Sequence, residues 1–290
     1  MTLERESSCK VNLLLNILDK RADGFHELET VMHPVKLHDI LSFHRQPKGI
    51  QLDCNLQALP TDSGNLVHRA ATAFFQTAGI REGVRIHLEK RIPLAAGLGG
   101  GSGNAAITLS ALNELFEAPL SPAQLQQVAS ALGSDVPFFL QSRPALATGR
   151  GEKIQPLEFF PALRNAAFLL VHPGFGISTA WVYQNLVRFP AALKGRPGRA
   201  QKLISLLQAA DLNTAGAEFF NSLEAPVFEK YPLLGLFQEF LRDNGAVATL
   251  MSGSGSTTFA LARGLVEAGT LAAKFKGRFG DSYWTTVVPV

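Results

Sequence analysis

The feature that most constrains this chain is a glycine-rich stretch at residues 92–106, which reads IPLAAGLGGGSGNAA. The segment before it, Val84–Lys90, alternates apolar and polar residues as a half-buried strand does. The segment after it, Ala105–Phe116, has apolar residues at helical spacing. The pattern therefore predicts that the glycines connect a strand to the first turn of a helix.

Such a connection favours the binding of an anion. Glycine has no Cβ, so its backbone adopts positive φ and lets a ligand approach the amides closely. The first N–H groups of a helix have no partner within the helix, and the helix dipole adds partial positive charge there. Together these properties predict a site that suits phosphate. A flexible surface loop is the alternative, but such a loop needs no helix directly behind it and gains nothing from Ser102 and Asn104.

Two familiar phosphate-binding loops do not fit this stretch. The P-loop needs a lysine after its glycines, and none follows here. The dinucleotide-binding fingerprint GxGxxG is only approached, because Gly97 and Gly99 are followed by Ser102 where the third glycine belongs. That fingerprint also needs an acidic residue about 20 residues further on, closing a second strand. Glu114 and Glu117 fall inside or just after the predicted helix instead, which excludes a dinucleotide-binding fold.

The order Pro-x-x-x-Gly-Leu-Gly-Gly-Gly-Ser, from Pro93 to Ser102, resembles the ATP loop of the GHMP kinase superfamily. Four more segments occur in the order found in one branch of that superfamily: Cys9–Leu13, Arg21–Leu28, Leu132–Phe139 and Ser252–Gly255. The similarity runs from residue 8 to about residue 260. This branch phosphorylates a cytidylyl derivative of methylerythritol in non-mevalonate isoprenoid biosynthesis.

The resemblance implies an α+β, two-domain GHMP kinase fold. Residues 1–157 would form a ribosomal-protein-S5-like N-terminal domain that binds ATP, and residues 158–290 a ferredoxin-like C-terminal domain. The active site would lie in the cleft between them. The implied reaction is phosphorylation of the 2-hydroxyl of the methylerythritol unit by ATP, which yields ADP and the 2-phosphate.

By motif position, Asp135 matches the catalytic aspartate of this branch and Lys10 the lysine that pairs with it. An alcohol is a poor nucleophile, so a carboxylate within hydrogen-bond reach can accept its proton during transfer. A lysine keeps that carboxylate ionised and offsets charge on the moving phosphoryl group. Taken alone, the spacing around Asp135 favours a plainer reading in which it caps a short helix.

The resemblance also assigns ligand-binding positions. Those for ATP are Asn65, Pro93, Gly97, Leu98, Gly99, Gly100, Gly101, Ser102 and Gly103. Mg²⁺ would bridge the ATP phosphates, and no residue is assigned as a metal ligand. The positions for the cytidylyl substrate are Asn12, Phe25, His26, Tyr183, Gly253 and Ser254.

Among the substrate positions, Phe25 and Tyr183 would stack on the two faces of the cytosine, and His26 would bond to its edge. On its own, His26 reads as a surface or hydrogen-bonded structural histidine, just past an Asp-Gly turn. The chain departs from the family pattern at three positions. Phe25 stands where tyrosine is common, Cys9 replaces an alanine, and Gly103 replaces a serine.

Composition limits the other classes of function. At 46% hydrophobic and 18% charged residues, the 290-residue chain has material for a sizeable core. Its formal net charge is +3 with Lys and Arg dispersed, which predicts no nucleic-acid partner. Two isolated cysteines, a charged N-terminus and the lack of long apolar runs predict a cytoplasmic protein with no membrane association. With the resemblance, we expect a bacterial protein that is a monomer or homodimer; the residues themselves do not decide between these two states.

The sequence alone leaves two other functions open. Another GHMP kinase, for mevalonate or homoserine, would share the glycine loop but lack the segment Asp23–His26. A non-catalytic relative that senses a nucleotide would typically have lost Lys10 or Asp135, and this chain has both.

Overall fold

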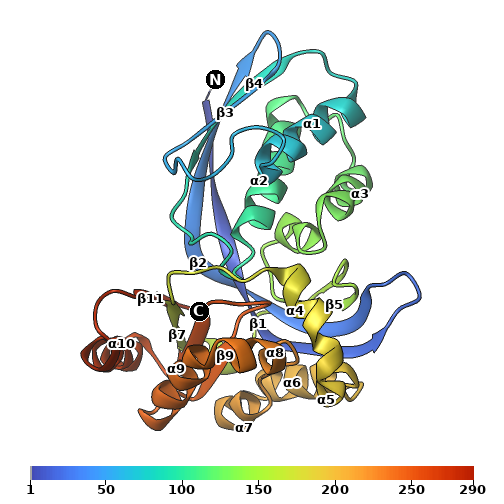
Figure 1. Ribbon diagram of the computed structural model, residues 1–290. Helices are drawn as coiled ribbons and strands as arrows, with labels where there is room; N and C mark the ends of the chain where they lie inside the picture. The colour runs from blue at the N-terminus through green and yellow to red at the C-terminus, as the bar shows by residue number, and fades with distance from the viewer. Residues whose placement is uncertain (1) are drawn as a thin grey trace. The chain divides into compact units, whose positions relative to one another are not determined.

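The computed structural model describes residues 2–290, which form two compact units (Figure 1). Unit 1 comprises residues 2–9, Leu37–Pro93 and Gly99–Ser142. Unit 2 comprises Lys10–Lys36, Leu94–Leu98 and Arg143–Val290. The chain therefore passes from one unit to the other several times. The expected division into domains at residue 157 stays a prediction.

Two long strands supply residues to both units. They are β1 (Thr2–Lys20) and β2 (His26–Gln46), and each extends beyond the strand predicted from the sequence, Lys10–Leu18 and Thr30–Phe43 respectively. Both strands are buried over much of their length, where alternation of polar and apolar residues gives little sign of where a strand ends.

In unit 1, the second half of β2 pairs antiparallel with β4 (Gly83–Glu89), and β4 pairs parallel with β3 (Ile50–Cys54). Helices α1 (Leu66–Ala78), α2 (Gly100–Leu115) and α3 (Pro122–Leu132) lie beside one another (Figure 1). The short 3₁₀ helix η1 (Val136–Leu140) packs against α2 and α3. Phe43, Phe74 and Phe138 are among the largest fully buried side chains of this core.

Helix boundaries in unit 1 follow local chemistry. Asn65 caps α1 by accepting a hydrogen bond from the Val67 backbone N–H. Ser121 and Gln124 form a reciprocal capping box at the start of α3, and Pro122 occupies its first turn. These predicted starts are confirmed. The start of α2 differs, because the helix begins at Gly100 rather than at Ala105.

Unit 2 contains a four-stranded antiparallel sheet in the order β11-β7-β10-β9. Its strands are β7 (Ala167–His172), β9 (Ala248–Met251), β10 (Thr258–Ala262) and β11 (Trp284–Pro289). Helices α9 (Pro232–Asp243) and α10 (Leu265–Phe279) pack against this sheet. Phe237 and Phe275, one from each helix, meet edge to face with ring centroids 4.9 Å apart.

Smaller elements complete unit 2. The first half of β2 pairs with β5 (Ala145–Gly149), β5 pairs with β6 (Lys153–Pro156), and β8 (Phe220–Asn221) pairs parallel with β1. The helices are η2 (Pro161–Leu163), α4 (Thr179–Asn185), η3 (Leu186–Arg188), α5 (Pro190–Leu193), α6 (Arg199–Gln208), α7 (Leu212–Ala217) and α8 (Glu224–Lys230). No helix within residues 2–290 is long and apolar enough to cross a membrane.

Candidate active site

Lys10 joins strand β1 to the glycine-rich stretch. Its side chain is buried, with 2% of the residue surface exposed. The Nζ atom donates to the Asn12 side-chain oxygen and to the Gly97 carbonyl oxygen, 3.0 Å away in the second case. The Lys10 backbone N–H also donates to the Leu98 carbonyl at 2.9 Å. A buried ammonium is costly unless polar groups surround it, and these oxygens supply that surrounding.

Asn12 is oriented by a second layer of bonds. Residues 10, 12 and 14 share one face of β1 because side chains alternate along a strand. The Asn12 amide nitrogen donates to the Thr30 hydroxyl at 2.8 Å, and that hydroxyl donates to the Leu14 carbonyl. The amide oxygen is thereby left facing Lys10. This arrangement fixes the position of the Lys10 ammonium group.

Gly97 also contacts the Ser252–Gly255 segment, the turn that follows β9. The Ser252 hydroxyl donates to the Gly97 carbonyl at 3.0 Å, so this oxygen accepts from both Ser252 and Lys10. Gly97 has a φ of +75°, and a Cβ added there would lie 2.1 Å from the Ser252 carbonyl oxygen. No other residue type fits such a position without a shift of the backbone. A Cβ added at Gly253 would lie 3.1 Å from Lys10 Nζ, so this turn adjoins the ammonium group.

Helix α2 presents its N-terminus in the glycine stretch, as predicted, although it starts earlier. Gly99 precedes the helix with φ of +70°, and residues 100–103 form its first turn. Within residues 2–290, no side chain caps this helix and its first turn holds no acidic residue, so its leading N–H groups suit a phosphate. Glycine's low helix propensity conceals this start from a sequence pattern.

Gly103, in the first turn of α2, packs closely on strand β1. A Cβ at this position would lie 2.7 Å from the Ser8 carbonyl oxygen and 3.0 Å from the Ser7 hydroxyl. The helix therefore packs on β1 more closely than a serine at position 103 would permit. The departure from the family pattern at Gly103 thus has a local packing reason.

Asp39, which no sequence motif indicated, binds the backbone just before the glycine-rich stretch. Asp39 is fully buried and accepts hydrogen bonds from the backbone N–H groups of Arg91 and Ile92 at 2.8 and 2.9 Å. Its other oxygen pairs with the ammonium of Lys90, which is also buried. The carboxylate therefore fixes the chain directly before Pro93. An aspartate within a long strand carried no motif that indicated this role.

Asp135 and Asn65 both belong to unit 1. Asp135 stands directly before η1, but in the described chain its carboxylate does not cap that helix, so the plainer interpretation of this residue is wrong. Asn65 is largely engaged in structure, because it caps α1 and its amide nitrogen donates to the Pro60 carbonyl at 2.8 Å. Catalysis by Asp135 and nucleotide contact by Asn65 stay predictions.

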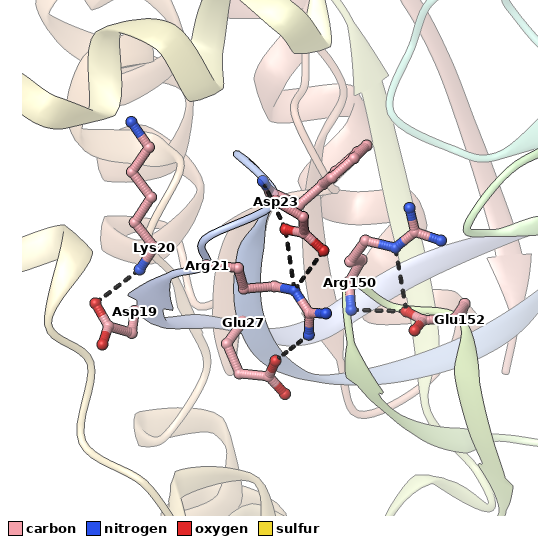
Figure 2. Close-up of polar contacts among 8 residues, drawn as sticks. Asp19, Lys20, Arg21, Asp23, Glu27, Arg150 and Glu152 are labelled. Atoms are coloured by element: carbon pink, nitrogen blue, oxygen red, sulfur yellow. Dashed lines mark hydrogen bonds and ion pairs between the residues drawn. The ribbon is translucent and has the colours of Figure 1, made fainter.

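The expected cytosine-binding residues all belong to unit 2. Phe25 is 51% exposed, and the Arg150 guanidinium carbon lies 4.6 Å from its ring centroid. Figure 2 shows the turn that follows β1: Arg21 binds the carboxylates of Asp23 and Glu27, and Arg150 lies beside them with Glu152. The Asp23 carboxylate also accepts from the Phe25 backbone N–H at 3.1 Å. These bonds hold the turn that presents the Phe25 ring to solvent.

His26 and Tyr183 are in ring contact, with centroids 5.2 Å apart and planes inclined by 33°. Burial, and then the charge of Lys20, lowers the pKa of His26, so its imidazole is neutral at neutral pH. A neutral imidazole offers one donor and one acceptor. Tyr183 lies on α4, whose N-terminal Thr179 hydroxyl contacts the Ser254 hydroxyl at 2.7 Å.

The structure thus brings together Lys10, Asn12, Gly97, Leu98 and Gly253 in one cluster. It also brings His26 into ring contact with Tyr183. Across residues 2–290, no group of three or more His, Cys, Asp or Glu side chains is placed to hold a metal ion.

Comparison with known proteins agrees with this architecture. The family model "GHMP kinases N terminal domain" matches residues 65–143, and "GHMP kinases C terminal" matches residues 189–281. A crystal structure of homoserine kinase from Cytophaga hutchinsonii covers 99% of this chain and 93% of its own, with a TM-score of 0.76 and 19% identity, which shows a shared fold. The fold and the glycine loop are those of a GHMP kinase, a class of ATP-dependent small-molecule kinases.

Relatives with higher sequence identity show which family of GHMP kinases the chain belongs to. The 4-diphosphocytidyl-2-C-methyl-D-erythritol kinase of Pelotomaculum thermopropionicum is 41% identical over 277 residues, which is 95% of this chain and 94% of the relative. A crystal structure of 4-(cytidine 5'-diphospho)-2C-methyl-D-erythritol kinase is 34% identical and covers 99% of this chain and 100% of its own, with a TM-score of 0.79. The chain belongs to the 4-diphosphocytidyl-2-C-methyl-D-erythritol kinase family. The predicted family and fold class are confirmed.

Proposed function

We propose that this chain transfers the γ-phosphoryl group of ATP to the 2-hydroxyl of 4-diphosphocytidyl-2-C-methyl-D-erythritol. The products are ADP and the 2-phosphate. The observation that carries this proposal is the 41% identity over 95% of the chain to a relative with that named activity, against 19% to the homoserine kinase. The chain's own glycine loop and buried Lys10 supply the parts that the reaction needs.

The chemistry assigns a role to Asp135 and Lys10. The oxygen of the 2-hydroxyl forms a bond to the γ-phosphorus as the bond from that phosphorus to the β–γ bridging oxygen breaks. Asp135 accepts the hydroxyl proton, which the transfer releases. Lys10 favours the ionised carboxylate and offsets negative charge on the phosphoryl oxygens. Lys10 is suited to this because Asn12 and Gly97 hold its ammonium in one place.

ATP binds through residues 97–103 in this proposal, with Asn65 near the nucleoside and Pro93 at the start of the loop. The uncapped N-terminus of α2 supports it, because its N–H groups and dipole favour phosphate oxygens. Mg²⁺ accompanies ATP and neutralises phosphate charge. It keeps several waters and takes phosphate oxygens as ligands, so it needs no cage of protein carboxylates.

The cytidylyl group binds at Phe25, His26 and Tyr183. The exposed Phe25 ring offers a face for stacking, which contributes on the order of 1–3 kcal/mol per base. The neutral His26 offers a hydrogen bond to the base edge, which distinguishes cytosine from uracil. Asn12, Gly253 and Ser254 contact the remainder of the substrate near Lys10.

We further propose that the protein acts in the bacterial cytoplasm as a monomer or homodimer and has no nucleic-acid partner. The dispersed basic residues and the small net charge of +3 support the last point. Residues 1–157 and 158–290 are proposed as the two family domains. A size-exclusion measurement with light scattering tests the oligomeric state.

An assay of ADP release tests the function. The purified chain is given ATP, Mg²⁺ and, in separate reactions, the cytidylyl substrate, mevalonate or homoserine. Turnover with the cytidylyl substrate alone is the expected result. Turnover with one of the other alcohols assigns a different kinase activity. Nucleotide binding without turnover of any alcohol indicates a sensor and overturns the proposal.

A further inference from the structure

A short segment of unit 2, Phe220–Glu224, is bonded to the strand that carries Lys10. Its first two residues form β8, and they pair parallel with Leu14 and Leu15 of β1. The Ser222 backbone N–H donates to the Leu15 carbonyl at 2.8 Å, and the Ile17 N–H donates to the Ser222 hydroxyl at 3.0 Å. The segment therefore has a fixed register against β1.

Asn221 extends from this segment to the turn after β9. It is 3% exposed, and its amide nitrogen donates to the carbonyl oxygens of Met251 and Gly253, both at 2.8 Å. Its amide oxygen accepts from the Leu223 backbone N–H at 2.9 Å. Both donor hydrogens and the acceptor are thus used. An aspartate has the same shape but would oppose two carbonyl oxygens with an acceptor.

Glu224 also bonds to Met251, through the backbone N–H group of that residue. One oxygen of its buried carboxyl group accepts from the Met251 backbone N–H at 2.8 Å and from the Gln238 amide at 2.6 Å. Burial raises the pKa of Glu224 to about 7, while the bonds from Met251 and Gln238 and the charge of Arg242 on α9 oppose the rise. A glutamine at this position would keep the accepting oxygen, whereas a leucine would not.

These bonds lead directly to the cluster around Lys10. Met251 is followed by Ser252, whose hydroxyl donates to the Gly97 carbonyl that also accepts from Lys10. We infer that Asn221 and Glu224 are positioning residues for phosphoryl transfer, because they fix the Met251–Gly253 turn and through it the Gly97 carbonyl that holds Lys10. Their catalytic effect rests on the proposed function, but the coupling between the turn and the loop does not.

The test compares full-length variants with a matched control. Asn221→Asp and Glu224→Leu remove the bonds to the turn, and Glu224→Gln keeps them. Glu229→Gln is the control, because Glu229 lies on the same helix α8 but pairs with Arg188 at the surface. Each variant is assayed for kcat and for both KM values, and hydrogen–deuterium exchange is measured without ligand over residues 94–98 and 251–256.

Asn221→Asp and Glu224→Leu are expected to speed exchange in both segments and to lower kcat by roughly ten- to a hundredfold, the loss typical of a small misplacement in an active site. Glu224→Gln and the control should stay within about twofold of the parent. Unchanged exchange over residues 94–98, or an unchanged kcat, would overturn the inference, even if thermal stability falls.

Two further outcomes are distinguishable. If Asn221→Asp does not fold, Ser252→Ala deletes only the hydroxyl bond to Gly97 and should show the same two effects on a smaller scale. If the parent chain releases no ADP with the cytidylyl substrate, the proposed function fails. The exchange measurement then still decides whether Asn221 and Glu224 order the 94–98 segment.

Discussion

The ring of His26 lies against the ring of Tyr183, although the two residues are more than 150 positions apart in sequence. The contact joins the first residue of β2 to helix α4, so a change in either ring alters the surroundings of the other. This relationship bears on how the proposed cytosine site discriminates between bases.

Tyr183→Ala is expected to weaken binding of the cytidylyl substrate by roughly ten- to a hundredfold, with little change for ATP, because a base stack of about 1–3 kcal/mol is lost. Tyr183→Phe keeps the ring and serves as the control. His26→Ala should instead reduce the preference for cytosine over uracil derivatives, since an edge bond is lost while the stack remains. Steady-state kinetics with both substrates give that ratio. A loss of thermal stability with an unaltered ratio would mean that these rings only pack the fold.

Asp135→Asn should keep its affinity for ATP and lose roughly two to four decades of turnover, the range for a positioned acid–base group. The amide has nearly the same shape, but it does not take up the hydroxyl proton. Asp211→Asn is a matched control, because Asp211 caps α7 at an exposed position and asparagine caps equally well. Single-turnover rates and calorimetry with ATP separate chemistry from binding. Full turnover in Asp135→Asn would remove this carboxylate from the mechanism.

Gly97→Ala should abolish most activity, because the added methyl group would lie 2.1 Å from the Ser252 carbonyl oxygen at a φ of +75°. Gly100→Val should raise the KM for ATP while the fold survives, since its Cβ meets side-chain atoms of Ile92 and Lys90 at 3.1 and 3.3 Å. Gly277→Ala in α10 is the control, where an added Cβ meets no described atom within 4 Å. Unchanged ATP binding in the loop variants, measured by calorimetry, would place the phosphates elsewhere.

Asp39→Ala is expected to destabilise the chain by about 3–5 kcal/mol, because it leaves the buried Lys90 ammonium without its carboxylate partner. Replacing both residues, as in Asp39→Leu with Lys90→Met, should recover part of that loss, since no charge is then buried alone. Urea unfolding of the single and double variants measures the difference. Equal stabilities for the single variant and the parent would show that the pair contributes nothing.

Stability should respond to pH through Glu224 and His33, whose pKa values are shifted in opposite directions. Glu224 has its pKa raised from 4.5 to about 7, so between these values the folded chain holds a proton that the unfolded chain has released. Its contribution to the free energy of unfolding therefore falls as pH rises through that window. Burial lowers the pKa of His33 from 6.5 to about 4, so its contribution rises with pH between 4 and 6.5.

Glu224→Gln should accordingly be more stable relative to the parent at pH 8 than at pH 4.5, by roughly 3 kcal/mol. The His33 ring contacts the rings of Phe159, Phe160 and Phe168. His33→Phe should show the reverse of Glu224→Gln: its stability relative to the parent is greater at pH 4 than at pH 7. Urea unfolding at a series of pH values measures both. Curves for variant and parent that run parallel would contradict the assignment.

Local patterns predicted the elements whose signals are local. Ser121 and Pro122 indicate the start of α3, and Asn65 indicates the start of α1. A helix cap depends on residues that are adjacent in sequence, so a sequence pattern reveals it. The start of α2 was placed too late, since Gly100, Gly101 and Gly103, which are helical, were interpreted as part of a loop. The short elements β8 and α8 were not predicted, because two to seven residues carry too little periodicity.

The residues of the candidate site also differ in whether a local sequence pattern reveals them. Lys10, Gly97 and the Ser252–Gly255 turn were found through motifs, and the structure joins them by hydrogen bonds. Asp39, Asn221 and Glu224 were not found. Each bonds to backbone groups at least 27 positions away, and an isolated acid or amide in a sequence does not indicate such a distant partner.

The interleaving of the two units limits how this chain can be divided. A fragment of residues 158–290 would lack the β1 residues against which β8 pairs, and also Ala96, whose carbonyl accepts from the Thr257 N–H at 3.0 Å. A fragment of residues 1–157 would in turn lack Ser252 and Asn221. Gene fusion or recombination at residue 157 would therefore exchange fragments that are contiguous in sequence but lack some of the residues they contact in the folded chain. Chimaeras between relatives are expected to keep the contacts within unit 2 when residues 10–36, 94–98 and 143–290 come from one parent.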